Sequence, residues 1–125
     1  CALGRTMPPL PQPWMITAHF CDLHDLNPEA TVYFQHYDTS MWPVKKGDIA
    51  IVDCEATAIL AGKVYLLDID NEGAIVRRAH PQADGSLVLT PDSTISRYLA
   101  ESVPRSALGK VRVVGRVVTW VLLDP

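Results

Sequence analysis

Residues 109–121 read Gly-Lys-Val-Arg-Val-Val-Gly-Arg-Val-Val-Thr-Trp-Val, and this run decides the fold class. Valine and threonine are enriched in strands because their branched side chains pack well on a pleated surface. Gly115 separates Arg112 from Arg116, and a glycine inside a strand is typical of a bulge that changes the facing of the residues after it. We therefore predict a long, bulged strand near the C-terminal end.

The segments before this run also have strand character. Apolar stretches alternate with turn sequences rich in Gly, Asp and Asn, and the predicted strands are 49–53, 62–69, 73–79 and 87–90. No stretch has helical periodicity of useful length; residues 28–30 and 96–102 form a helical turn or two at most. This pattern predicts an all-β fold, a compact and highly bent β-barrel or sandwich.

Composition limits the function classes. The chain has 125 residues, which is the size of one domain, and 48% hydrophobic with 20% charged residues predicts a folded core. A net charge of −3 gives no basic surface for nucleic acid, so any contact with DNA would be made by another domain. The best apolar run, 111–123, contains two arginines and is shorter than the roughly 20 residues that cross a bilayer.

The N-terminal end predicts the domain organisation. Four prolines within residues 1–13 predict an extended linker or arm, because proline fixes φ and lacks the amide donor. The folded domain is then 14–125. The chain starts at Cys1, from which we expect a fragment or processed product with an N-terminal domain missing.

Cysteine and histidine give weak signals only. Cys1, Cys21 and Cys54 are interpreted as reduced thiols of a cytosolic protein, with a bridge between Cys21 and Cys54 left open. The segment from His19 to His24 has ligand types that zinc accepts, but no second pair of ligands follows it. We interpret these residues as ordinary loop residues and expect neither a metal nor a cofactor.

A more specific signal is the pair Ser40 and Arg77. Ser40 lies in a predicted turn that leads into a strand, and Arg77 lies 37 residues later on another predicted strand. A serine and a basic residue in this order, separated by a β-rich interval, have the layout of a Ser-Lys nucleophilic site, except that arginine stands where that chemistry uses lysine.

Beyond this pair, six segments of the chain match the sequence motifs of a known protein family in the same order and with the same spacing. The chain resembles the C-terminal domains of phage and SOS repressors, the self-cleaving Ser-Lys peptidase family that includes LexA, the lambda repressor and UmuD. The turn containing Ser40 is similar to the family's Gly-Asp-Ser-Met-x-Pro, and Val76-Arg-Arg to its Val-Lys-Arg. The match covers about residues 30 to 122, in the segments 38–43, 46–53, 62–67, 76–78, 84–93 and 114–118.

The resemblance implies that Ser40 occupies the nucleophile position and Arg77 the position of the general-base lysine. A buried lysine acts as a base because desolvation lowers its pKa. Arginine stays protonated and has no acceptor lone pair. The family is cleaved at Ala-Gly or Cys-Gly before the serine, and neither dipeptide precedes Ser40 here. We therefore expect the fold without self-cleavage, so that the domain is more a scaffold than an enzyme.

Three alternatives stay open. In the first, Ser40 is only a turn residue that bonds its own backbone. In the second, Arg77 is a surface arginine, or a partly buried one that is bonded to carbonyls or a carboxylate. Another base replaces the lysine, either Lys63 on a strand or His36, which lies four residues before Ser40. Lys45 and Lys46 lie in a turn and are expected to be solvated.

From the resemblance we expect the oligomerisation and regulatory domain of a phage-type transcriptional repressor in the bacterial cytoplasm. Its partners would be a second copy of itself, an antirepressor protein or RecA, and a missing N-terminal helix-turn-helix domain would bind operator DNA. The dimer contact is expected on the C-terminal strand, at Trp120, Val118 and Arg116. The alternatives are an active, RecA-stimulated self-cleaving peptidase with Ser40 and a substitute base, or an accessory subunit like UmuD.

Overall fold

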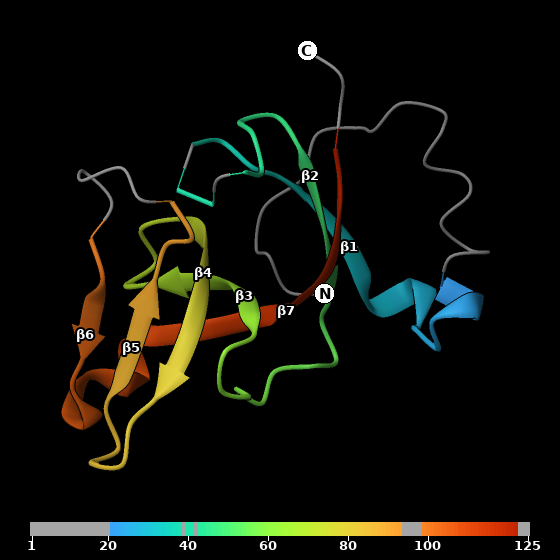
Figure 1. Cartoon of the computed structure of the whole chain (residues 1–125). Helices are drawn as coiled ribbons and strands as arrows, with labels where there is room; N and C mark the ends of the chain where they lie inside the picture. The colour runs from blue at the N-terminus through green and yellow to red at the C-terminus, as the bar shows by residue number, and fades with distance from the viewer. Residues whose placement is uncertain (1–20, 39, 42, 94–98, 123–125) are drawn as a thin grey trace.

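A computed structural model describes residues 21–38, 40–41, 43–93 and 99–122. Its seven strands form one antiparallel sheet in the order β1-β2-β7-β3-β4-β5-β6 (Figure 1). The strands are β1 (Thr31–Gln35), β2 (Ile49–Asp53), β3 (Val64–Ile69), β4 (Ala74–Pro81), β5 (Leu87–Thr90), β6 (Glu101–Val103) and β7 (Val111–Val121). The all-β prediction is confirmed. The sheet is bent but open, with β1 and β6 as its two edges, so it does not close into a barrel.

The five predicted strands are all present, and β2 has the bounds read from the sequence. The turn between β3 and β4 places Asp70 and Asn71 at positive φ, which asparagine and aspartate tolerate better than most residues. Short 3-10 helices, η2 (Pro28–Ala30) and η3 (Arg105–Lys110), precede β1 and β7. For residues 96–102 the sequence predicts a helical turn or two at most; within their described part no helix is present, and Glu101 and Ser102 belong to the edge strand β6, which was not predicted.

The long strand β7 joins the two halves of the sheet. Its C-terminal half pairs with β2 and its N-terminal half with β3, and the register of each pairing shifts once. The predicted irregularity near Gly115 is therefore confirmed. A Cβ atom at Gly115 would overlap the backbone carbonyl of Asp53 and lie 2.8 Å from a methyl carbon of Val52. Glycine is needed here because the backbone of another strand occupies the space of a side chain.

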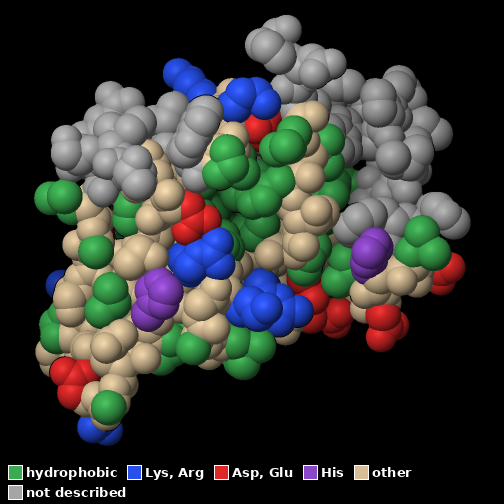
Figure 2. All heavy atoms as spheres, viewed as in Figure 1, with side chains coloured by type: hydrophobic (Ala, Val, Ile, Leu, Met, Phe, Trp, Pro, Cys, Tyr) green, Lys and Arg blue, Asp and Glu red, His purple; other side chains and the backbone are tan. Residues whose placement is uncertain are grey.

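Two hydrophobic clusters lie along the bent sheet. The first is built on Met41, Val52, Leu66, Val76 and neighbouring residues of β2 and β7. The second is built on Tyr65, Leu67, Ala79, Leu87 and Leu89. Figure 2 shows hydrophobic side chains gathered in a hollow between β4 and the β1–β2 pair. The neighbouring residues of β3 contribute to different clusters because adjacent side chains of a strand point to opposite faces.

The remaining structural expectations have mixed outcomes. The proline-rich arm 1–13 and His19 lie outside the described residues. Cys21 is a free, buried thiol, so the bridge between Cys21 and Cys54 is not formed. Cys54 is disulfide-bonded, which corrects the interpretation of all cysteines as reduced thiols. Within the described residues, no three His, Cys, Asp or Glu side chains are grouped as metal ligands, and no helix has the length and apolarity to span a membrane.

Candidate active-site region around Ser40

The segment between β1 and β2 folds back on itself and holds Ser40 inside the molecule. The backbone amide of His36 donates to Asp48 O at 2.9 Å, and that of Gly47 donates to His36 O at 2.7 Å. The buried carboxylate of Asp48 accepts from the Lys45 amide at 2.7 Å and lies 3.5 Å from Lys45 Nζ. These contacts close the second half of the loop, and Met41 anchors its first half in the hydrophobic core.

Asp38 fixes the orientation of Ser40. Its Oδ1 atom accepts hydrogen bonds from the Ser40 amide at 2.9 Å and from Ser40 Oγ at 2.5 Å. An aspartate that bonds the backbone two residues ahead forms an Asx turn, which explains the sharp bend at this point. The carbonyl of Ser40 accepts from the amide of Ser93 at 2.8 Å, and Ser40 itself is fully buried. Its hydroxyl hydrogen is thus directed at a carboxylate.

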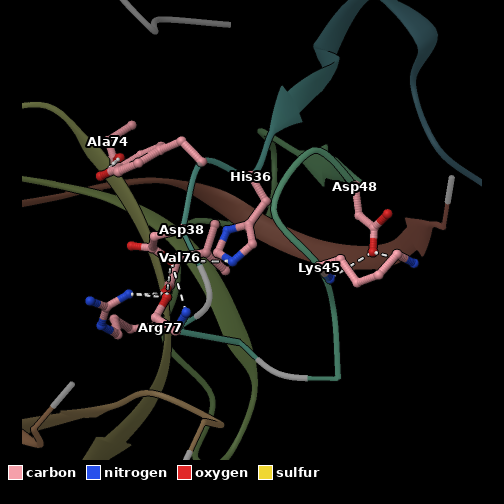
Figure 3. A network of polar contacts seen from close by, with 9 residues as sticks. His36, Asp38, Lys45, Asp48, Ala74, Val76 and Arg77 are labelled. Carbon is pink, nitrogen blue, oxygen red and sulfur yellow. Dashed lines mark hydrogen bonds and ion pairs between the residues drawn. The ribbon is translucent and has the colours of Figure 1, made fainter. Parts of the chain in front are cut away.

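Arg77 approaches the same hydroxyl from β4. Its Nη1 atom donates to Ser40 Oγ at 2.9 Å and to the carbonyl of Val76 at 2.7 Å (Figure 3). The structure therefore brings together the two residues that the sequence pattern singled out, although 37 positions separate them. Arg77 is half-buried and bonded to a carbonyl, one of the alternatives left open for it.

Neither substitute base lies in hydrogen-bond contact with Ser40. His36 is buried, and its Nε2 atom lies 3.3 Å from Asp38 Oδ1, so the aspartate stands between the ring and the serine. The ring also packs edge-on against Trp120, with centroids 5.5 Å apart. Lys63 is exposed, and neither side-chain hydrogen bond of Ser40 Oγ involves it. Among the described residues, Ser40 Oγ has only Asp38 and Arg77 as side-chain hydrogen-bond partners.

Burial and charge set the protonation of this cluster. Burial lowers the pKa of His36; Asp38 opposes this effect and Arg77 adds to it. The imidazole is therefore neutral at pH 7, and its contact with Asp38 is not an ion pair. For Asp38, burial acts to raise the pKa, but the hydrogen bonds from Ser40 and the nearby His36 and Arg77 outweigh it, so the pKa is lowered. Asp38 is ionised and a weak base.

The geometry decides what this cluster can do chemically. The Ser40 hydroxyl donates to Asp38 and accepts from Arg77, so both partners hold it in place. Arg77 has no lone pair with which to remove the proton. Asp38 was missed in the sequence, although Asp-x-Ser before a strand is the signature of an Asx turn and identifies the carboxylate as a partner of the serine.

The buried His36 predicts a specific pH dependence of stability. The unfolded imidazole has a pKa of about 6.5 and the folded one a lower value, so protons favour the unfolded chain. The contribution of His36 is present in full above about pH 6.5 and is lost as the pH falls through the folded pKa. In urea unfolding at pH 7.5 and 5.5, we expect His36→Phe to lose less stability than the wild type. His80→Gln is the control and should lose as much as the wild type; equal losses in all three proteins would contradict the prediction.

The predicted dimer residues lie on β7 and are partly exposed. Trp120 contacts the first hydrophobic cluster as well as His36, and Arg116 stands opposite Asp53 of β2 and Tyr65 of β3 in the sheet. Val118 lies beside them on the same strand. Trp120 thus packs within the chain, and the part of all three residues in oligomerisation stays a prediction.

The comparisons with known proteins identify the family of the chain. No curated protein matches the chain. The family model described as "Peptidase S24-like" matches residues 8–118, which is most of the sequence. Because this match spans the loop with Ser40, the strand with Arg77 and most of β7, the chain belongs to the Peptidase S24-like family.

Proposed function

We propose that this S24-like domain is the C-terminal oligomerisation and regulatory domain of a phage-type transcriptional repressor and that it does not cleave itself. Family membership supports the general assignment. The observation that supports the absence of self-cleavage is the 2.9 Å hydrogen bond from Arg77 Nη1 to Ser40 Oγ. A permanent cation stands where the chemistry of Ser40 would require a neutral amine.

The inactivity follows from the state of the serine. Its hydroxyl must lose a proton to attack a carbonyl, and general-base assistance is worth about 10²–10⁴-fold in rate. Ser40 faces a guanidinium and an aspartate whose pKa is lowered, so neither neighbour is an effective base near pH 7. Ser40 is also fully buried, and a peptide bond would have to displace existing contacts to reach it.

A scaffold of this kind acts by assembly. Joining two DNA-binding domains makes the second operator contact intramolecular and raises its effective concentration. The partly exposed residues of β7, with Trp120, Val118 and Arg116, provide the self-association surface in this proposal. The DNA-binding domain is a separate helix-turn-helix unit in the bacterial cytoplasm. An antirepressor that binds this domain, rather than RecA-stimulated cleavage, relieves repression.

The proposal is tested by incubating the full-length natural protein with activated RecA, and separately at alkaline pH. We expect the wild type to stay intact in both conditions, like Ser40→Ala, when analysed by mass spectrometry. LexA serves as the positive control for RecA. A cut upstream of Ser40 that disappears in Ser40→Ala would overturn the proposal and establish an active peptidase.

A further inference from the structure

A hollow lies at the end of the sheet that β6 forms, and none of its residues belongs to the Ser40 cluster. It has a volume of about 720 Å³ and lies between the β4–β5 turn, β6 and the start of η3, at the lower left of Figure 1. The residues that line this hollow, named the Arg105 hollow below, are Asp84, Ser86, Ser102, Pro104, Arg105 and Ser106. Five of the six have polar side chains and two of these carry opposite charges, so the hollow suits a polar, charged ligand.

The β4–β5 turn fixes the carboxylate of Asp84 in this hollow. Asp84 Oδ1 accepts hydrogen bonds from the Ser86 amide at 2.9 Å and from Ser86 Oγ at 2.6 Å. These bonds lower the pKa of Asp84, the side-chain bond more than the backbone one, so the carboxylate is ionised at pH 7. Among the described residues, no other one donates a hydrogen bond to Asp84 Oδ2, and this oxygen is available to a ligand.

Arg105 reaches the same hollow from the start of η3. Its aliphatic stem passes over Gly85, because a Cβ atom at Gly85 would lie 2.9 Å from Arg105 Cδ and 3.3 Å from its Cγ. Gly85 has a φ of +87°, so glycine both permits the turn and leaves space for the stem. This contact restricts the stem and reduces the entropy that the side chain loses when it binds a ligand.

Asp84 and Arg105 line one hollow without pairing with each other. Of the residues that the structure describes, none forms an ion pair or a hydrogen bond with the Arg105 guanidinium, and none forms an ion pair with Asp84. The hydroxyls of Ser102 and Ser106 also bond no other described residue, and each can donate to an anion. The hollow therefore presents a cationic side with three kinds of donor and a separate anionic side.

From this arrangement we infer that the Arg105 hollow binds a small zwitterion of the amino-acid type. The carboxylate of the ligand accepts from Arg105 and from the hydroxyls of Ser102 and Ser106, and its ammonium group donates to Asp84 Oδ2. A simple anion binds less well because Asp84 repels it, and a simple cation because Arg105 repels it. The inference goes beyond the proposed function, since the hollow includes neither the Ser40 cluster nor the predicted dimer residues of β7.

The test is an NMR titration of the ¹⁵N-labelled full chain at pH 7 and low salt, because salt screens exposed charges. The probes are glycine, 4-aminobutanoate and 6-aminohexanoate, in which the two charges stand progressively further apart, each with the acid and the amine of the same length. We expect the best zwitterion to shift the amides of Asp84, Ser86, Ser102 and Ser106. It should bind about threefold or more tightly than its acid or its amine, the gain expected from one added exposed ion pair.

Variants assign each charge to its residue. Arg105→Gln and Asp84→Asn should each lose about threefold or more in affinity for the zwitterion. Asparagine can still accept from Ser86, so Asp84→Asn keeps the turn; it should bind the simple acid more tightly than the wild type does, because the repulsion is gone. Lys110→Gln removes a positive charge from the last turn of η3, outside the hollow, and should bind like the wild type.

Three results would overturn the inference. These are a best zwitterion that binds no more tightly than its acid and its amine, amide shifts that lie only outside the hollow, and an Arg105→Gln variant that binds like the wild type. None of these measurements depends on Ser40 or on the RecA experiment, so the two proposals fail separately.

Discussion

Arg77→Lys is expected to make Ser40 react with a fluorophosphonate probe that does not label the wild type. The half-buried site disfavours a charged amine, so the introduced lysine has a neutral fraction that can accept the serine proton. A general base in this position is worth about 10²–10⁴-fold in rate. The probe reports the reactivity of the hydroxyl directly and needs no cleavage sequence, which this chain lacks before Ser40.

Asp38 limits how large this gain becomes. A carboxylate close to the new lysine favours its charged form, and it also retains the serine proton. The sequence resemblance places glycine at this position in the related Gly-Asp-Ser-Met turn. We therefore expect the double variant Asp38→Gly/Arg77→Lys to label faster than Arg77→Lys alone.

Two variants serve as controls for the labelling experiment. Arg78→Lys makes the same chemical change one position along β4 and should stay unlabelled, because Arg78 contacts Asp92 and Gly62 rather than Ser40. Adding Ser40→Ala to the double variant should remove all labelling. A folded double variant that remains unreactive, or a wild type that already labels at Ser40, would show that the arginine is not what silences the serine.

The second large effect is expected for Gly115→Ala in β7. The added methyl group would overlap the backbone carbonyl of Asp53, and backbone of a central strand cannot move aside without breaking its hydrogen bonds. Overpacking of this kind costs about 1–3 kcal/mol and occasionally more. We expect the free energy of unfolding, measured in urea, to fall by at least that amount, or the variant to fail to fold.

Gly109→Ala provides the matched control for Gly115→Ala. A Cβ atom at Gly109 would meet nothing within 4 Å, so this variant should change stability by no more than about 0.5 kcal/mol. If both alanine variants were equally stable, the close approach of β7 to Asp53 would not exist in solution.

The strands could be predicted from sequence where local chemistry decides them. In β2 and β7, β-branched residues follow turn sequences, and both strands lie where the pattern placed them. The edge strand β6 has three residues, two of them polar, and forms because β5 offers a partner. No local pattern specifies such a strand. A bent sheet closes into a barrel only if its two edge strands pair with each other. The amino-acid composition does not determine whether they do.

In the candidate site, too, some residues were predictable from local sequence and others depend on how distant strands pair. Ser40 and Arg77 were selected by spacing and resemblance, but the facing of Arg77 depends on the register of β4 against β3, which a one-residue shift would reverse. Asp38 lies two residues from Ser40 and was recognisable by turn chemistry alone. The contact of His36 with Trp120 joins residues 84 positions apart through the β2–β7 pairing, and no sequence pattern indicates it.

The position of β7 between β2 and β3 also governs when the Ser40 cluster can exist. As the ribosome releases the polypeptide, the β1–β2 pair and the β3–β4 pair emerge before β7, and no strand of one pair is a neighbour of a strand of the other. Among the described strands, β7 (111–121) is the last in the chain and the one that pairs with both β2 and β3. A nascent chain without β7 therefore carries Ser40 and Arg77 on separate hairpins, and we expect their hydrogen bond to form only after residues 111–121 have been made.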